Sequence, residues 1–174
     1  MVWASLRAVV GRHPRRAGQV AAWLRVGPAL DGAGYLRLRL QGVTHVVDLR
    51  DECCDDPDEM DALGIRWRRL PIVEGEAPTT RQLNDLMRWL EAEADEVPGA
   101  SLYLHGGVGR ARTATVAIAL LMHQDLTLDQ AQHQVAQVWP EAALRPAQRA
   151  FLDGLAMRLS GAVPVADWQT AGDG

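Results

Sequence analysis

The sequence predicts an α/β fold in which a central, mostly parallel sheet is flanked by helices. Short apolar segments rich in β-branched residues alternate along the chain with longer amphipathic segments, the order expected of strands and helices in this class. A glycine-rich stretch over residues 105–112 stands between one such apolar segment and a long helical one. Because loops of this kind lie at the carboxyl end of a strand, we expect the functional site along that edge of the sheet.

The length and composition fit a single domain. The chain has 174 residues, of which 48% are hydrophobic and 23% charged, enough to bury a core without disulfides or metal ions. It has no uninterrupted apolar tract of membrane-spanning length, and Arg7 breaks its mildly apolar start, so we expect neither a membrane anchor nor a secretory signal. We assign residues 1–18 to an N-terminal extension, 19–159 to the domain and 160–174 to a C-terminal tail.

The charge and the cysteines indicate which partners and which cellular compartment fit this protein. The net charge is −4 and all 18 basic residues are arginine, a bias that does not indicate nucleic acid binding. The only cysteines, Cys53 and Cys54, are adjacent and cannot easily close a disulfide with each other. A reducing, cytoplasmic location fits this pattern best.

Strand and helix patterns alternate through the first half of the domain. Gly27 and Pro28 end the first strand, Gly42 stops the first helix, and Pro57 begins a short helix after an acidic loop. The expected elements are a strand over 20–26, a helix over about 29–40, a buried strand over 43–50, a short helix near 57 and a strand over 66–70.

The second half of the domain is predicted to be mainly helical. Thr79 and Thr80 precede an amphipathic stretch whose leucines and methionine fall on one face, which predicts a helix that ends before Pro98. Thr127 has the position of another helix N-cap. The expected elements are a loop over 71–80, a helix over about 81–94, a strand over 101–104, and helices over 113–122, 128–138 and 146–159.

Residues 105–113, with the sequence HGGVGRART, have the features of a phosphate-binding loop. Between a strand and a helix, successive backbone N–H groups point inward and the helix N-terminus adds unpaired donors. Gly109 permits tight curvature, and Arg112 can place its planar guanidinium against two phosphate oxygens. The predicted phosphate-binding residues are Gly107, Val108, Gly109, Arg110, Ala111 and Arg112.

Nucleotide and metal sites agree less well with the sequence. No Lys-Ser/Thr pair follows the loop, as a Walker A motif requires, and the third glycine of a dinucleotide fingerprint is missing. His45, His123 and His133 lack metal-ligand spacing such as His-Glu-x-x-His. We therefore predict no metal and no cofactor.

From about Gln19 to Leu159, the chain resembles the dual-specificity branch of the protein-tyrosine-phosphatase family. Residues 105–113 match the family signature, His-Cys-x-x-Gly-x-x-Arg-Ser/Thr, except that Gly106 stands at the position of the cysteine. The resemblance implies the fold of that family and a pocket for a phosphorylated group. The other similar segments are residues 23–28, 42–50, 70–72, 112–122 and 145–152.

The resemblance also implies roles for individual residues. Active members of the family form a phosphocysteine intermediate, which Gly106 cannot form because it has no side chain. Glu74 stands at the general-acid position, usually an aspartate, and its longer side chain shifts the carboxyl group. His105 and Thr113 match residues that tune the missing thiol, and Arg112 matches the arginine that holds phosphate.

Three functions remain open at this point. The leading hypothesis is a pseudophosphatase that binds a phosphorylated protein or another phosphomonoester without hydrolysing it. The second is an active protein tyrosine/serine/threonine phosphatase whose cysteine at position 106 has been substituted, and the third is an interaction scaffold with an unused pocket. The signature leaves open the oligomeric state and the choice between phosphotyrosine, phosphothreonine, phosphoinositide and RNA 5′-phosphate.

Overall fold

The computed structural model describes residues 17–107 and 110–161, which contain a five-stranded sheet. The strands lie in the order β1-β2-β5-β3-β4, and only the edge pair of β1 and β2 is antiparallel. This confirms the mostly parallel α/β architecture that the sequence predicts. The strands are β1 (Gly18–Ala21), β2 (Leu24–Pro28), β3 (His45–Arg50), β4 (Arg66–Ile72) and β5 (Leu102–Gly106).

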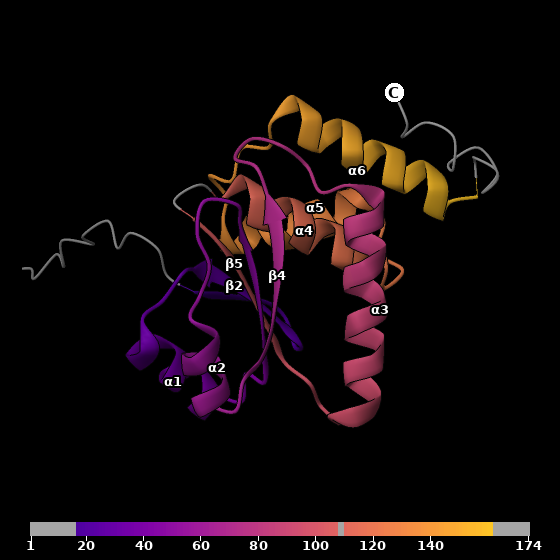
Figure 1. Cartoon of the computed structure of the whole chain (residues 1–174). Helices are drawn as coiled ribbons and strands as arrows, with labels where there is room; N and C mark the ends of the chain where they lie inside the picture. Colours follow the sequence, from indigo (N-terminus) through magenta and orange to yellow (C-terminus); the bar gives the residue numbers. More distant parts are fainter. Residues whose placement is uncertain (1–16, 108–109, 162–174) are drawn as a thin grey trace, which may run out of the picture.

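The helices form two layers, one on each face of the sheet (Figure 1). One layer, α1 and α2, packs over a small core, and the other, α3 to α6, packs over a larger one. The helices are α1 (Gly32–Leu40), α2 (Pro57–Ala62), α3 (Thr80–Glu96), α4 (Ala111–Met122), α5 (Leu128–Val138) and α6 (Pro146–Leu159).

The side chains of the central strand point alternately to the two faces of the sheet, which explains why helices cover both faces. In β5, Leu102 and Leu104 enter the larger core, whereas Tyr103 between them enters the smaller one. The neighbouring strand β3 shows the same alternation, with Val47 in the larger core and Val46 in the smaller one. Because successive side chains of a strand point to opposite faces, an apolar strand of this kind needs helices on both sides.

Several helices begin at side chains that the sequence marks as caps. Thr79 accepts a hydrogen bond from the backbone N–H of Gln82, which in turn reaches back to the N-cap backbone, and Thr127 and Gln130 repeat this capping box at α5. Asp31 caps α1 by accepting a hydrogen bond from the backbone N–H of Gly34. These local signals explain why the expected helix starts agree with the structure to within a few residues.

Three of the expected elements were wrong in detail. The expected strand over 20–26 is a hairpin, because the chain turns at Ala22 and Trp23 and β1 folds back on β2. The strand expected to end at residue 70 continues through Pro71 to Ile72, since β4 is an edge strand and tolerates a residue without a backbone N–H. The helix after the glycine loop begins at Ala111, two residues before its expected start.

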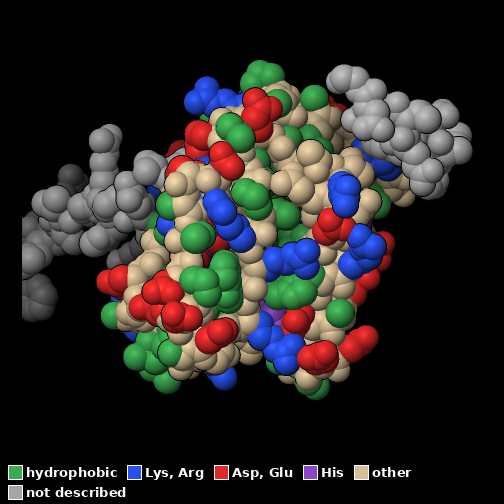
Figure 2. All heavy atoms as spheres, in the orientation of Figure 1, with side chains coloured by type: hydrophobic (Ala, Val, Ile, Leu, Met, Phe, Trp, Pro, Cys, Tyr) green, Lys and Arg blue, Asp and Glu red, His purple; other side chains and the backbone are tan. Residues whose placement is uncertain are grey.

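Acidic and basic side chains intermingle on the face of the molecule seen in Figure 2. Blue and red side chains lie close together over β4 and α3 in this view. Among the residues of these elements, Arg66 contacts Glu93 and Glu96, and Arg88 contacts Asp85. Within residues 17–107 and 110–161, no helix is long and apolar enough to cross a membrane.

Candidate phosphate-binding site

The glycine loop leaves the middle of the sheet and leads into a buried helix. β5 lies between β2 and β3 and ends at Gly106, and α4 begins at Ala111. Every residue of α4 from Arg112 to Met122 is buried, so the helix axis and its first turn are held firmly by packing. Val108 and Gly109, two of the predicted phosphate-binding residues, lie outside the described residues.

Arg112 lies in the first turn of α4, and its side chain is only 1% exposed. Its Nη1 and Nη2 donate hydrogen bonds to Oε2 and Oε1 of Glu52, at 2.9 and 2.8 Å, and Nη1 also donates to the backbone oxygen of Ile72 at 2.7 Å. Its Nε is buried and has no hydrogen-bond partner among the described residues. A guanidinium in this position can bind an anion in a two-point contact, and at present it binds a carboxylate.

Glu74 also reaches Arg112. Residues 73–76 form a turn closed by a hydrogen bond from the backbone N–H of Glu76 to the oxygen of Val73, and Gly75 supplies the φ of +88° that the turn needs. The turn places Glu74 Oε2 2.8 Å from Arg112 Nη2. The structure thus brings together the residue that was predicted at the general-acid position and the arginine of the signature.

The carboxylate of Glu52 lies directly against the loop. A Cβ added to Gly107 would stand 2.5 Å from Glu52 Oε1 and 2.9 Å from Arg112 Nη2. The hydrogen bonds from Arg112 lower the pKa of Glu52 to about 2, so the carboxylate is ionised at neutral pH. Glu52 and Glu74 are nevertheless about half exposed, at 52% and 60%, so both side chains have room to turn away from the arginine.

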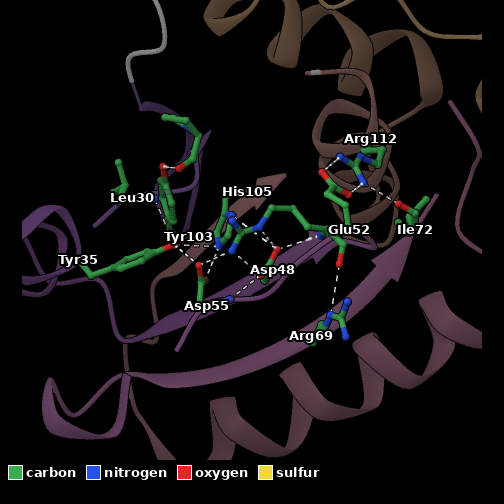
Figure 3. A network of polar contacts seen from close by, with 12 residues as sticks. Leu30, Tyr35, Asp48, Glu52, Asp55, Arg69, Ile72, Tyr103, His105 and Arg112 are labelled. Carbon is green, nitrogen blue, oxygen red and sulfur yellow. Dashed lines mark hydrogen bonds and ion pairs between the residues drawn. The ribbon is translucent and has the colours of Figure 1, made fainter. Parts of the chain in front are cut away.

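His105 is fully buried and points into a polar cluster (Figure 3). Its Nε2 lies 2.7 Å from Asp55 Oδ2 and 3.1 Å from the Tyr35 hydroxyl, which itself donates to Asp55 Oδ1 at 2.9 Å. Burial opposes ionisation of Asp55, but the hydrogen bonds from His105 and Tyr35 hold the pKa of Asp55 below its usual value. Because an ionised carboxylate only accepts hydrogen bonds, His105 carries a proton on Nε2.

Arg50 joins this cluster from the end of β3. It donates to both oxygens of Asp48, from Nε at 2.9 Å and Nη2 at 2.8 Å, and its Nη2 lies 2.6 Å from Asp55 Oδ1. Asp48, Asp55 and His105 hold three potential metal-ligand atoms within 4.8 Å of one another. The guanidinium of Arg50 already donates hydrogen bonds to both carboxylates, so we assign no metal to this position.

The remaining predicted residues surround the loop without joining the cluster on Arg112. Thr113 is buried in α4, and Ala111 begins that helix. Arg110 forms an ion pair with Glu141 and lies 5.5 Å from the centre of the Trp139 ring, which ties the loop to the segment between α5 and α6. Cys53 and Cys54 are exposed and free.

Several residues of the site are absent from the sequence-based prediction. Glu52 follows β3 at the carboxyl edge of the sheet, next to the end of β5, and that position was the signal that could have found it. Asp55 and Tyr35 belong to no sequence motif, so no local signal could have identified them. Gln148 of α6 is buried and donates from Nε2 to the backbone oxygen of Glu76 at 3.0 Å, which secures the turn that carries Glu74.

These features define a class of protein. A parallel sheet whose central strand leads through a glycine loop into a helix with a buried arginine in its first turn is the arrangement of the cysteine-dependent phosphatases. The chain belongs to the family described as polymorphic toxin system, DSP-PTPase phosphatase, whose sequence profile matches residues 20–125. No curated protein matches the sequence.

Solved structures agree with this family. Tk-PTP in the active form is 27% identical and has a TM-score of 0.71, covering 82% of this chain and 97% of its own. A mouse putative dual specificity phosphatase complexed with zinc tungstate is 26% identical, with a TM-score of 0.70 and coverage of 91% and 96%. Human DUSP28 is 26% identical, with a TM-score of 0.66 and coverage of 84% and 95%. The chain is therefore a dual-specificity-phosphatase-like domain.

Proposed function

We propose that the domain, residues 19–159, binds a phosphorylated group at Arg112 and does not hydrolyse it. The observation that carries the proposal is the two-point contact between Arg112 and the carboxylate of Glu52, which lies against the loop backbone at Gly107. A phosphate can make the same contact with two of its oxygens and can also accept from the unpaired Nε. Gly106 offers no nucleophile, and loss of a nucleophile costs on the order of a million-fold in turnover.

Phosphate must displace the carboxylates to reach the arginine. Two negative side chains already contact the single positive charge of Arg112, and a dianion beside them would be repelled. Both carboxylates are half exposed and can turn into solvent, so displacement requires no change in the core. The proposal therefore includes an exchange of partners, in which phosphate replaces Glu52, Glu74 or both on the guanidinium.

Calorimetric titration tests the binding step. A phosphotyrosine peptide and inorganic phosphate are titrated against the protein, an Arg112→Lys variant and an Arg149→Ala variant, which changes an exposed arginine of α6. We expect binding by the protein and by Arg149→Ala, and at least tenfold weaker binding by Arg112→Lys, because an ammonium cannot make the two-point contact. Absence of binding by the unaltered protein would contradict the proposal, and circular dichroism verifies that each variant is folded.

Hydrolysis of a chromogenic aryl phosphate tests the catalytic step. We expect no turnover by the protein and measurable turnover by Gly106→Cys, in which the thiolate attacks phosphorus and Glu74 protonates the departing oxygen. Turnover by the unaltered protein would overturn the assignment as a pseudophosphatase. Turnover only after cysteine is introduced would also support the second candidate, an active phosphatase whose cysteine has been substituted. The contact between Glu74 and Arg112 favours that candidate, because it keeps a carboxyl group within reach of a phosphate bound to the arginine.

The family description suggests the biological system in which the protein acts. That description names phosphatases of polymorphic toxin systems, and we extend that setting to this chain as part of the proposal. The partner would be a phosphorylated protein or another phosphomonoester, held without turnover. The exposed free thiols of Cys53 and Cys54 are consistent with the cytoplasmic location that we propose for the domain.

A further inference from the structure

The side chains on Arg112 carry more negative than positive charge. Glu52 Oε1 and Glu74 Oε2 each lie 2.8 Å from the same atom, Nη2 of Arg112, so two carboxylates share one guanidinium. Figure 3 shows Glu52 reaching the guanidinium from the loop after β3. Because each carboxylate brings one negative charge and the arginine only one positive charge, the three side chains together have a net charge of about −1.

Two further acids extend this surplus along the edge of the sheet. Asp51 precedes Glu52 on the loop after β3, and Glu76 follows Glu74 at the turn after β4, and both are exposed. The two segments lie side by side, because β3 and β4 are parallel neighbours whose last residues are paired in register. We call these four residues, Asp51, Glu52, Glu74 and Glu76, the acidic rim of the phosphate-binding site.

The other arginines near the acidic rim do not offset its charge. Arg50 binds the two aspartates of the buried cluster, and Arg110 forms an ion pair with Glu141. Arg69 donates to the backbone oxygens of residues 50 and 51 and has no ion pair with a carboxylate within the described residues. One exposed cation beside four acids leaves the described part of the rim net negative.

Binding of phosphate to Arg112 would increase the surplus. The dianion takes the guanidinium from Glu52 and Glu74, which then stand beside it without their cation. A ligand with further negative groups next to its phosphate meets like charges there, which weakens its binding. A ligand with cations next to its phosphate gives the displaced carboxylates new partners, so the same acids favour it.

We propose that the ligand is a phosphorylated peptide segment with arginine or lysine beside the phosphorylated residue, an inference that rests on phosphate binding at Arg112. The phosphate binds the guanidinium, and the basic side chains of the peptide pair with Glu52 and Glu74. A phosphoinositide or an RNA 5′-end carries additional phosphate groups and no such cations, so the acidic rim disfavours both. The rim therefore selects one of the ligand classes that the signature leaves open.

Fluorescence anisotropy with labelled phosphotyrosine peptides tests the proposal. Three peptides differ only in the residues beside the phosphotyrosine, which are arginine, alanine or glutamate. We expect the arginine peptide to bind about fivefold more tightly than the alanine peptide, and the glutamate peptide to bind most weakly, because exposed ion pairs contribute modestly. The differences should shrink in about 0.5 M salt. Equal affinities would overturn the proposal, as would equal binding of the arginine peptide without its phosphate.

Two double variants locate the preference. Glu52→Gln with Glu74→Gln removes both charges, so the arginine and alanine peptides should bind it almost equally, and the alanine peptide should bind no more weakly than before. Glu91→Gln with Asp95→Asn removes two charges from exposed positions in the last turns of α3 and should keep the preference. A preference that persists in the first variant, or is lost equally in both, would contradict selection by the rim.

Competition separates this inference from phosphate binding itself. Inositol trisphosphate and a 5′-phosphorylated trinucleotide of RNA should displace the arginine peptide only at about tenfold higher concentration than the unlabelled peptide does. Stronger displacement by either would assign the site to that class and overturn the proposal. Binding of inorganic phosphate without any preference among the peptides would refute the peptide class alone, whereas absence of binding by every phosphate compound would refute phosphate binding at Arg112 as well.

Discussion

Arg112 donates two parallel hydrogen bonds to Glu52, a residue 60 positions away in the chain, and so holds a carboxylate against the loop where we propose that phosphate binds. The pair has two opposite effects. It stabilises a guanidinium whose side chain is 1% exposed, and it places a negative charge in the path of an anionic ligand. The two effects can be separated by substitution.

The substitution Glu52→Gln should raise the affinity for inorganic phosphate several-fold. The amide has nearly the shape of the carboxylate but no charge, so the phosphate dianion meets less repulsion at Arg112. The same change should lower the free energy of unfolding by about 1 kcal/mol, because a half-exposed charged hydrogen bond is weakened. Calorimetric titration and urea denaturation measure the two quantities. A lower phosphate affinity in Glu52→Gln would show that the carboxylate is no competitor.

Stability should fall in acid partly through Glu52. Its pKa is depressed from 4.5 to about 2 by Arg112, so its ion pair stabilises the fold fully above about pH 4.5 and is lost as the pH falls toward 2. Urea denaturation at a series of pH values should therefore show a shallower loss in Glu52→Gln than in the unaltered protein. Glu76→Gln, which changes an exposed carboxylate on the neighbouring turn, should follow the unaltered protein. Parallel curves for all three proteins would refute this origin of the acid sensitivity.

The buried cluster around His105 should be sensitive to loss of a single charge. Asp55→Asn leaves His105 and Arg50 without their shared carboxylate, and breaking such a buried pair costs about 3 kcal/mol or more. Asp56→Asn is the matched control, because Asp56 is exposed and asparagine caps a helix as well as aspartate does. Chemical denaturation should separate the two variants clearly, and equal stability would mean that the cluster contributes little.

Gly27 in β2 should not accept a side chain. A Cβ at this position would stand 2.0 Å from the hydroxyl of Tyr103, a buried residue whose hydroxyl donates to the backbone oxygen of Pro28. We expect Gly27→Ala to lower the free energy of unfolding by about 2–3 kcal/mol. Gly154→Ala, inside α6 with ordinary space for a Cβ, should instead stabilise the protein by about 0.5–1 kcal/mol. Thermal denaturation of both variants checks the opposite signs.

Gln148 should secure the turn that carries Glu74. Gln148→Leu removes the hydrogen bond to the oxygen of Glu76 and the one accepted from the backbone N–H of Arg145, at a cost of about 1–3 kcal/mol. Hydrogen exchange over residues 73–79 should become faster than in Gln137→Leu, a substitution on the exposed surface of α5. Unchanged exchange over this segment would mean that other contacts hold the turn.

Local patterns were sufficient to predict the elements near the loop. The apolar strand, the glycine-rich stretch and the helix that follows are adjacent in sequence, and strand alternation and helix capping depend on neighbouring residues. They led to the α/β class and to Gly106 and Arg112 as the central positions of the site. The hairpin of β1 and β2 escaped prediction, because one continuous apolar run hides a turn that only strand pairing reveals.

The sequence by itself determined the alternation of strands and helices and the places of Gly106 and Arg112 in the signature. Only the tertiary structure decided what that arginine touches. Glu52 and Glu74 follow two different strands and meet Arg112 because the order of β5, β3 and β4 brings those strand ends to one edge. His105 likewise meets Asp55 and Tyr35 only after folding. Contacts across such distances depend on strand order and register, which no local pattern encodes.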